Sequence, residues 1–194
     1  MSLNKREFMN ANETNIFDYL SNIVFITGGT KSGKSEFAEH LAKGSENLSY
    51  IALSENNSKD KEWQEKINLH RKRRPKDWIL IETTDLLNTL SKEEGPLLID
   101  SIGGFVMESI EREHQEWVTK MHLLIEVLKK RKSKTFIVGE QVGWSLVSEY
   151  KIGNTYIERI GELQKRITKI SKDNWLAING RAIKIDEISI EIPT

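Results

Sequence analysis

A glycine-rich stretch at residues 28–35 contains the residue types of a phosphate-binding loop. It reads Gly-Gly-Thr-Lys-Ser-Gly-Lys-Ser and fits the pattern G-x-x-x-x-G-K-[ST]. Glycines let the backbone curl so that its N–H groups point at a polyphosphate, and a following helix adds its positive dipole end. Lys34 would reach the outer phosphates and the Ser35 hydroxyl would bind Mg²⁺. The stretch follows an apolar run at 23–26 and precedes an amphipathic one, so we predict a nucleoside triphosphate site over a simple helix-capping turn.

A second oxygen ligand for the metal is expected from an aspartate further along the chain. Leu-Leu-Ile at 97–99 has the composition of a buried strand, and Asp100 follows it directly. An aspartate in this place commonly helps the loop serine to hold Mg²⁺ in phosphate-loop enzymes. Strands also end in aspartate as an ordinary turn residue. We expect Ser35 and Asp100 to be the magnesium ligands.

A histidine lies in a basic segment that reads His-Arg-Lys-Arg-Arg-Pro at 70–75. Arg73 and Arg74 follow His70 by three and four positions, which places them on its face of a helix. Guanidinium charge favours the neutral imidazole that can attack phosphorus, and it neutralises the phosphates being displaced. From the chemistry alone, a solvated basic helix end with an incidental histidine is the more economical interpretation.

Composition excludes several classes of protein. The chain has 194 residues, with 29 Lys and Arg against 29 Asp and Glu, so no overall positive field draws it to nucleic acid. It has no cysteine, which excludes disulfides and thiolate chemistry. No apolar run approaches the ~18–20 residues of a membrane span, and the N-terminus lacks a signal core. We expect a cytoplasmic protein with a single catalytic domain at 22–194 and an N-terminal extension at 1–21.

Apolar runs alternate with helical patterns along the chain. The predicted strands are 23–26, 50–53, 78–82, 97–100 and 135–139, and a terminal hairpin joins 175–178 to 182–185 around Asn-Gly. The predicted helices are 34–43, 59–73, one or two within 105–132, and 155–170. This alternation is typical of an α/β fold of the P-loop NTPase type, with a mostly parallel sheet, helices on both faces and a C-terminal β-hairpin.

Taken together, the motifs resemble the bifunctional adenosylcobinamide kinase/adenosylcobinamide-phosphate guanylyltransferase family of cobalamin biosynthesis. The resemblance rests on the loop, on Tyr-Ile-Ala at 50–52, on H-R-x-x-R-P at 70–75 with Trp78 and Glu82, and on L-L-I-D ending at Asp100. It runs in order from about residue 23 to residue 184 and leaves residues 1–22 outside.

The resemblance implies a two-step enzyme. It would phosphorylate the aminopropanol hydroxyl of adenosylcobinamide, a corrinoid, with ATP or GTP. It would then transfer GMP from GTP to that phosphate through a GMP-histidine intermediate, giving adenosylcobinamide-GDP and pyrophosphate. His70 would carry the intermediate, Lys34 would act in catalysis, and the enzyme would be a homotrimer. The implied nucleotide contacts are Gly28, Gly29, Thr30, Lys31, Ser32, Gly33, Lys34, Ser35, Ala52, Leu53, Ser54, Arg71, Lys72, Arg73, Arg74, Glu82 and Asp100.

Two segments in the second half depart from the family pattern. The family element N-E-V-G-x-G-I-V-P-E reads Glu-Gln-Val-Gly-Trp-Ser-Leu-Val-Ser-Glu at 140–149, and F-R-D-x-x-G-x-x-N-Q reads Tyr-Ile-Glu-Arg-Ile-Gly-Glu-Leu-Gln-Lys at 156–165. The departures do not fall within the loop or at His70, so they concern the acceptor or the number of activities kept. The alternatives are a small-molecule kinase without guanylyl transfer and a nucleotide-switched regulator. The regulator is disfavoured because no N-K-x-D element follows the loop.

Overall fold

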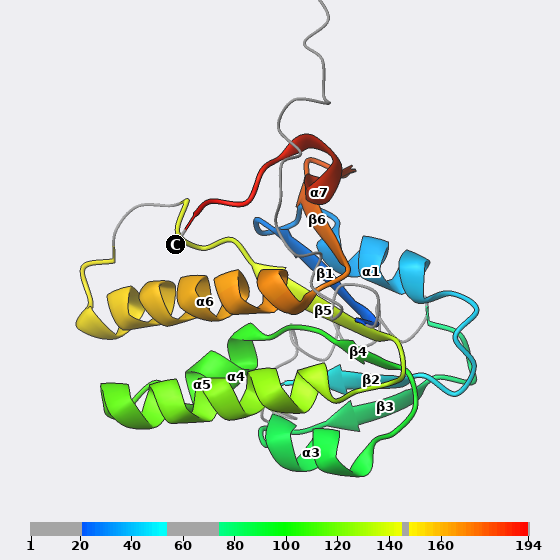
Figure 1. Ribbon diagram of the computed structural model, residues 1–194, viewed down its shortest axis with the longest axis horizontal. Coiled ribbons are helices and arrows are strands. Elements are labelled where there is room, and N and C mark those ends of the chain that lie inside the picture. Colours follow the sequence, from blue (N-terminus) through cyan, green and yellow to red (C-terminus); the bar gives the residue numbers. More distant parts are fainter. Residues whose placement is uncertain (1–20, 54–73, 145–147, 194) are drawn as a thin grey trace, which may run out of the picture.

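The computed structural model describes residues 21–53, 74–144 and 148–193, which form a sheet covered by helices (Figure 1). The strands are β1 (Ile23–Gly28), β2 (Ser49–Ala52), β3 (Ile79–Glu82), β4 (Leu97–Ile99), β5 (Thr135–Glu140), β6 (Asp173–Ile178) and β7 (Arg181–Lys184). The helices are α1 (Lys34–Ala42), α3 (Leu86–Lys92), α4 (Gly103–Glu108), α5 (His114–Lys129), α6 (Lys151–Ile170) and α7 (Ile185–Ile188).

The seven strands are ordered β3-β2-β4-β5-β1-β6-β7, and every neighbouring pair is parallel except β6–β7. Figure 1 shows α1 on one face of this sheet and α4, α5 and α6 on the other. The predicted α/β class, the mostly parallel sheet with helices on both faces and the C-terminal hairpin are therefore confirmed.

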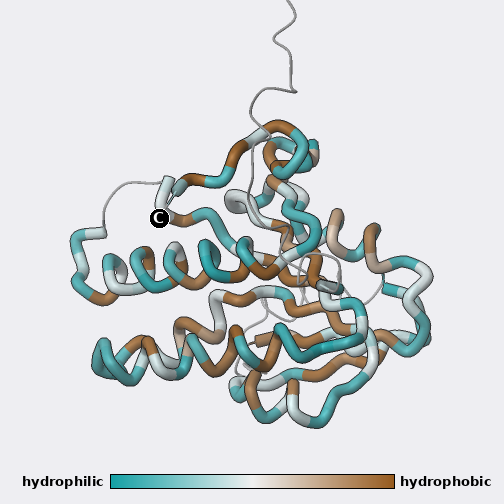
Figure 2. Tube along the Cα trace, in the orientation of Figure 1, coloured by the Kyte–Doolittle hydropathy of each residue, from teal (hydrophilic) through white to brown (hydrophobic). Residues whose placement is uncertain are grey.

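The two faces of the sheet build two separate hydrophobic clusters. Because successive side chains of a strand point to opposite faces, Leu97 and Ile99 of β4 join the cluster under α5 and α6, whereas Leu98 joins the cluster under α1. Figure 2 shows the central strands coloured as hydrophobic along most of their length, while the helices alternate. A strand buried on both faces needs such a continuous apolar run, which is the pattern that predicted these strands.

The described elements include two helices, α3 and α7, that were not predicted. The helical stretch at 105–132 holds two helices, α4 and α5, which is one of the two possibilities predicted for it. Both missed helices are short, with seven and four residues, so their periodicity is weak. The predicted helix at 59–73 and residues 1–20 of the predicted extension lie outside the described residues.

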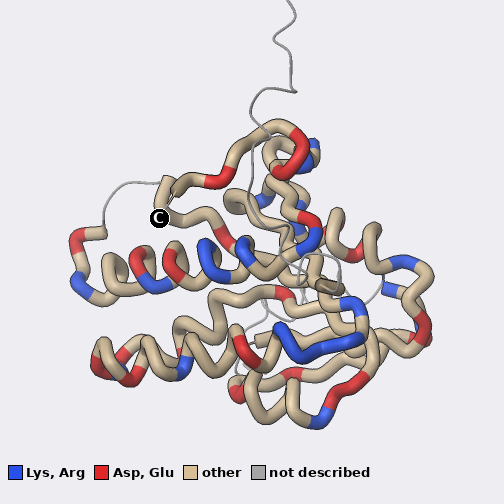
Figure 3. The backbone as a smooth tube through the Cα atoms, viewed as in Figure 1, with Lys and Arg blue, Asp and Glu red and all other residues tan. Residues whose placement is uncertain are grey.

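Positive and negative side chains are distributed evenly along the described chain. Lys and Arg are interspersed with Asp and Glu along the described chain (Figure 3). Within the described ranges, no helix has the length and apolar character needed to cross a membrane.

A buried arginine fixes the turn between α4 and α5. The guanidinium of Arg159, on α6, donates to the backbone oxygens of Ser109 at 2.5 Å, Ile110 at 3.2 Å and Arg112 at 2.6 Å. It also lies 5.4 Å from the ring centroid of Trp117. These contacts attach α6 to the chain that follows α4, and α4 forms one wall of the candidate site described below.

We expect Arg159→Met to lower the free energy of unfolding by about 3 kcal/mol, because buried carbonyls that lose a charged donor cost roughly 1–3 kcal/mol each. Arg166→Met is the matched control on the same helix. Arg166 is half exposed and pairs with Glu162 at 3.2 Å, so its loss should cost less than about 1 kcal/mol. Urea unfolding of both variants measures the difference in the free energy of unfolding. Equally small losses in the two variants would contradict a stabilising role for the Arg159 hydrogen bonds.

Candidate nucleotide-binding site

Residues 28–35, called the phosphate loop from here on, connect β1 to α1 in a conformation that requires glycine. Gly33 precedes α1 with a φ of 93°, a region that disfavours other residues, and its carbonyl accepts from the Phe37 amide at 2.9 Å. A Cβ on Gly28 would lie 2.6 Å from Ser32 Oγ and would collide with the carbonyl of Ala177 on β6. The loop is therefore packed tightly between β1, α1 and β6.

Polar groups of the phosphate loop contact the loop itself and the β6–β7 turn. Lys34 Nζ donates to the Gly29 carbonyl at 3.1 Å, so the side chain lies back across the loop. The Ser32 carbonyl accepts from the Gly180 amide at 3.0 Å, which ties the loop to the β6–β7 turn. Ser32 Oγ is buried and has no hydrogen-bond partner among the described residues. Buried polar groups are rarely left unpaired, so this hydroxyl is available to a ligand in the loop.

The start of α1 and the end of β4 meet at Asp100. Ser35 Oγ donates to Asp100 Oδ1 at 3.2 Å, and the Tyr50 hydroxyl donates to Asp100 Oδ2 at 2.5 Å. Burial, and then the negative charge of Asp100, raise the pKa of the Tyr50 hydroxyl far above its ordinary value, so Tyr50 remains a donor. The two predicted magnesium ligands are therefore brought into contact, and Tyr50 holds the carboxylate from the other side.

Arg74 is the described end of the predicted basic segment, and it packs against Tyr50. Its guanidinium carbon lies 3.3 Å from the centroid of the Tyr50 ring, and its Nε lies 3.7 Å from Glu39 Oε1 on α1. Trp78 stacks on Tyr50 at a centroid distance of 6.4 Å. The structure thus fixes Arg74 beside α1, the helix that begins at the phosphate loop.

The other described candidates lie at the same edge of the sheet, where the parallel strands end. Ala52 ends β2 and is followed by Leu53, and the exposed Glu82 ends β3 in register with Ala52. His70, Arg71, Lys72, Arg73 and Ser54 lie outside the described residues, and their roles remain predictions.

A network behind the loop was missed by sequence reasoning. Thr27 Oγ1 donates to Gln164 Oε1 at 2.8 Å and accepts from Gln141 Nε2 at 3.0 Å. Gln164 Nε2 in turn donates to the Glu140 carbonyl at 3.0 Å. These contacts join the ends of β1 and β5 to α6. The one available signal was that Gln141 and Gln164 lie in the two segments that depart from the family pattern.

Glu140, at the end of β5, was also missed as a candidate. Its Oε1 accepts a hydrogen bond from the Ser101 hydroxyl, and its Oε2 is buried without a partner among the described residues. Burial raises the pKa of this carboxyl, although the Ser101 hydrogen bond and the charge of Lys34 oppose the shift. The side chain lines a cavity of about 700 Å³, called the edge cavity below, together with Leu53, Gly103, Gly104, Met107 and Tyr156 among others.

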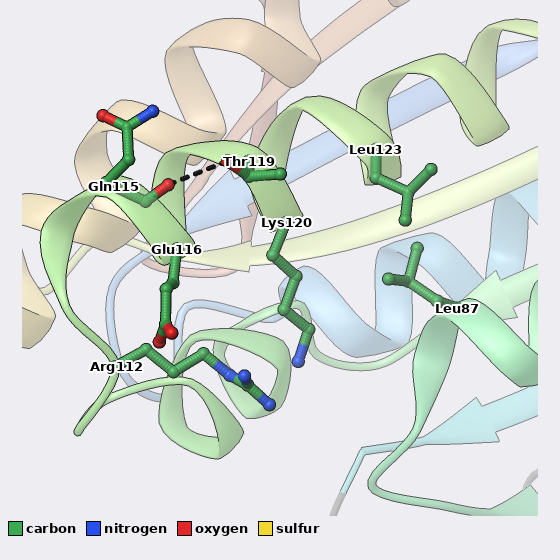
Figure 4. A pocket seen from close by; sticks show the side chains of 7 residues that line it. All are labelled: Leu87, Arg112, Gln115, Glu116, Thr119, Lys120 and Leu123. Atoms are coloured by element: carbon green, nitrogen blue, oxygen red, sulfur yellow. Dashed lines mark hydrogen bonds between the residues drawn. The ribbon is translucent and has the colours of Figure 1, made fainter.

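A further hollow lies between α3 and α5, lined by Leu87, Lys120 and Leu123 among others (Figure 4). Thr119 donates to the Gln115 carbonyl at 2.9 Å in its wall, as an ordinary contact within α5. None of its lining residues belongs to the phosphate loop or to a strand end. We therefore leave it out of the candidate site.

Comparisons with known proteins agree with this geometry. A family model described as cobinamide kinase / cobinamide phosphate guanyltransferase matches residues 24–185. The bifunctional adenosylcobalamin biosynthesis proteins CobU of Escherichia coli (strain K12) and of Salmonella typhimurium (strain LT2) are each 25% identical over 181 residues. The matches cover 84% of this chain and 99% of each relative.

Among solved structures, the chain is similar to the assembled ATPase EscN, in complex with its central stalk EscO, from the enteropathogenic E. coli type III secretion system. The TM-score is 0.51 at 12% identity, and the match covers 81% of this chain but only 42% of EscN. At this identity the likeness concerns the fold alone, and it supports the predicted P-loop NTPase type.

Replacing Glu140 by glutamine tests the cost of burying its carboxylate. Because its pKa is raised by folding, the folded protein holds this proton more tightly than the unfolded chain, where glutamate titrates near about 4.3. The parent should lose stability relative to Glu140→Gln as the pH rises from below about 4 through the raised folded-state pKa. Urea unfolding should find the variant more stable at pH about 7.5 and the two equal at pH about 3.5. A variant less stable at the higher pH would contradict the raised pKa.

Proposed function

The chain belongs to the cobinamide kinase / cobinamide phosphate guanyltransferase family, and we propose that it carries out both reactions of its curated relatives at one phosphate loop. The first reaction phosphorylates adenosylcobinamide with ATP or GTP. The second transfers GMP from GTP to adenosylcobinamide phosphate and gives adenosylcobinamide-GDP. The observation that carries the proposal is the contact of Ser35 with Asp100 at the base of the loop, within a chain that matches the family over 24–185.

The phosphate loop supplies the groups that hold a triphosphate. Its curled backbone and the start of α1 direct N–H groups toward bound phosphates, and Lys34 adds a positive charge once it releases the Gly29 carbonyl. The unpartnered Ser32 hydroxyl is a further donor. These groups would serve both reactions, because each one requires the polyphosphate of a nucleotide to be held while one phosphorus is attacked.

The oxygens of Ser35 and Asp100 fit Mg²⁺, which prefers hard oxygen ligands and usually keeps one or two protein ligands besides the phosphates. When bound, Mg²⁺ would neutralise charge on the phosphates. Tyr50 would keep Asp100 turned toward Ser35.

In the second reaction we assign His70 as the nucleophile. Its neutral imidazole nitrogen would attack the α-phosphorus of GTP, forming an N–P bond as the bond to pyrophosphate breaks. The phosphate oxygen of adenosylcobinamide phosphate would then displace the histidine, which splits one difficult transfer into two easier ones. The position of Arg74 supports this assignment, because its contacts with Glu39 and Tyr50 hold the end of the same basic segment against α1, the helix that begins at the loop.

The family resemblance extends the proposal to assembly and location. It supports a homotrimer, which light scattering on the purified protein would test directly. It also supports a cytoplasmic enzyme whose partners are GTP, ATP and a corrinoid.

Incubation with GTP labelled at the α-phosphate tests the second reaction. We expect the parent to acquire an acid-labile, alkali-stable label on denaturing gels, because a phosphoramidate has that stability. His70→Ala should abolish the label. His40→Ala is the matched control, since His40 is exposed on α1 and stacks on Phe37 at 6.4 Å, and it should keep the label. If the parent binds nucleotide but acquires no label, the guanylyl-transfer assignment is wrong and the kinase without that step is the remaining function.

A further inference from the structure

The edge cavity lies beside the phosphate loop, on the side of α4. Its walls come from the ends of β2, β3 and β5, from α4 and the turn after it, and from α6. Parallel strands end at one edge of the sheet, and Gly28 and Glu140 are register partners on β1 and β5. The first residue of the loop and the carboxylate of the cavity are therefore on adjacent strands.

The cavity is built around the Glu140 carboxylate. A Cβ on Gly103 would lie 2.8 Å from Oε1 and 2.9 Å from Oε2, and it would collide with the Tyr156 hydroxyl. A side chain at position 103 would force the Tyr156 hydroxyl and the Glu140 carboxylate to move. A Cβ on Gly104 would likewise collide with the carbonyl of Leu53. The glycine pair thus lets α4 approach β2 while the carboxylate keeps its place in the cavity wall.

The lining has the chemistry of a site for an alcohol on an aliphatic arm. Leu53, Met107 and Ile110 provide apolar surface, and Glu140 offers a buried oxygen that lacks a donor. Glu111 also lines the cavity, and so does Glu108, whose carboxylate is paired with Lys120 and Arg112. The described lining therefore offers no cation to a polyphosphate. A neutral hydroxyl would give Oε2 the donor that the described residues do not supply.

We propose that the edge cavity binds the hydroxyl-bearing arm of the acceptor and that Glu140 takes the proton from that hydroxyl during phosphorylation. The inference rests on the proposed function and adds to it the place of the acceptor and the base. In the step, the hydroxyl oxygen bonds to the γ-phosphorus as the bond between that phosphorus and the β,γ-bridging oxygen breaks. ADP or GDP leaves, and the hydroxyl proton passes to Glu140.

Two further observations support this role for Glu140. Its carboxyl has a raised pKa through burial, which makes it a better proton acceptor than an exposed glutamate. The charge of Lys34 is near enough to oppose that shift, so the carboxylate lies within electrostatic range of the phosphate loop. The neighbouring Gln141 instead donates to Thr27 behind the loop. This chain therefore presents its carboxylate at position 140, where the family pattern has Asn, and an amide at 141, where the pattern has Glu.

Separate assays of the two reactions distinguish a role of Glu140 as general base from a structural role. Phosphorylation of adenosylcobinamide is followed with γ-labelled ATP. Guanylyl transfer is followed with GTP and supplied adenosylcobinamide phosphate, whose attacking oxygen is already ionised and needs no base. We expect Glu140→Gln to lower kcat of phosphorylation at least about 100-fold, the usual range for a lost general base, and to affect guanylyl transfer far less. Glu158→Gln, an exposed glutamate on the same helix as Tyr156, should behave as the parent in both.

Two results would overturn the assignment: a parent-like phosphorylation rate in Glu140→Gln, or an equal loss of both reactions, which would indicate a structural role. Gly103→Ala gives a second test, because its Cβ crowds the carboxylate and should slow phosphorylation selectively. If the parent does not phosphorylate adenosylcobinamide, the proposed kinase function is wrong, and the role of Glu140 is wrong with it. If the parent is active and only the variants lose phosphorylation, the kinase function stands.

Discussion

The parallel pairing of β4, β5 and β1 is the constraint on which the whole site depends. It sends the ends of three neighbouring strands to one edge of the sheet, where Asp100, Glu140 and the phosphate loop follow them. The register pairs Gly28 with Glu140, and the amide of Asp100 donates to the Ile51 carbonyl on β2 at 3.0 Å. The two hydrophobic clusters hold this sheet from both faces, so the candidate groups are positioned by the core and not by the loops alone.

The carboxylates at this edge are held in different ways, and the difference indicates different roles. Asp100 accepts hydrogen bonds from both Ser35 and Tyr50, which suits a fixed metal ligand. Glu39 is paired with Arg74 and connects α1 to the basic segment. The Glu140 carboxylate accepts from the Ser101 hydroxyl through Oε1, and its Oε2 is buried without a partner among the described residues, so it can accept a proton or a hydrogen bond.

The sequence predicted what local patterns can encode. The alternating strands and helices and the terminal hairpin follow from short-range spacing, and the described residues confirm them. Residues 28–35 lie between a strand and a helix, as that spacing predicted. The Tyr50–Asp100, Thr27–Gln164 and Thr27–Gln141 contacts join residues 50, 137 and 114 positions apart, and periodicity carries no information on such partners. Glu140 looked like an ordinary strand end, because its burial and its lack of a donor arise only when α4 and α6 pack over β5.

The central claim is that one phosphate loop serves both phosphorylation and guanylyl transfer, and Lys34→Met tests it most directly. With the two reactions assayed separately, we predict that both rates fall together by at least about 100-fold, since a preorganised charge on the transferring phosphates is worth that much. Lys43→Met, at the exposed far end of α1, should leave both rates unchanged. A Lys34→Met enzyme that loses one reaction and keeps the other would contradict a shared loop and would require a second nucleotide site.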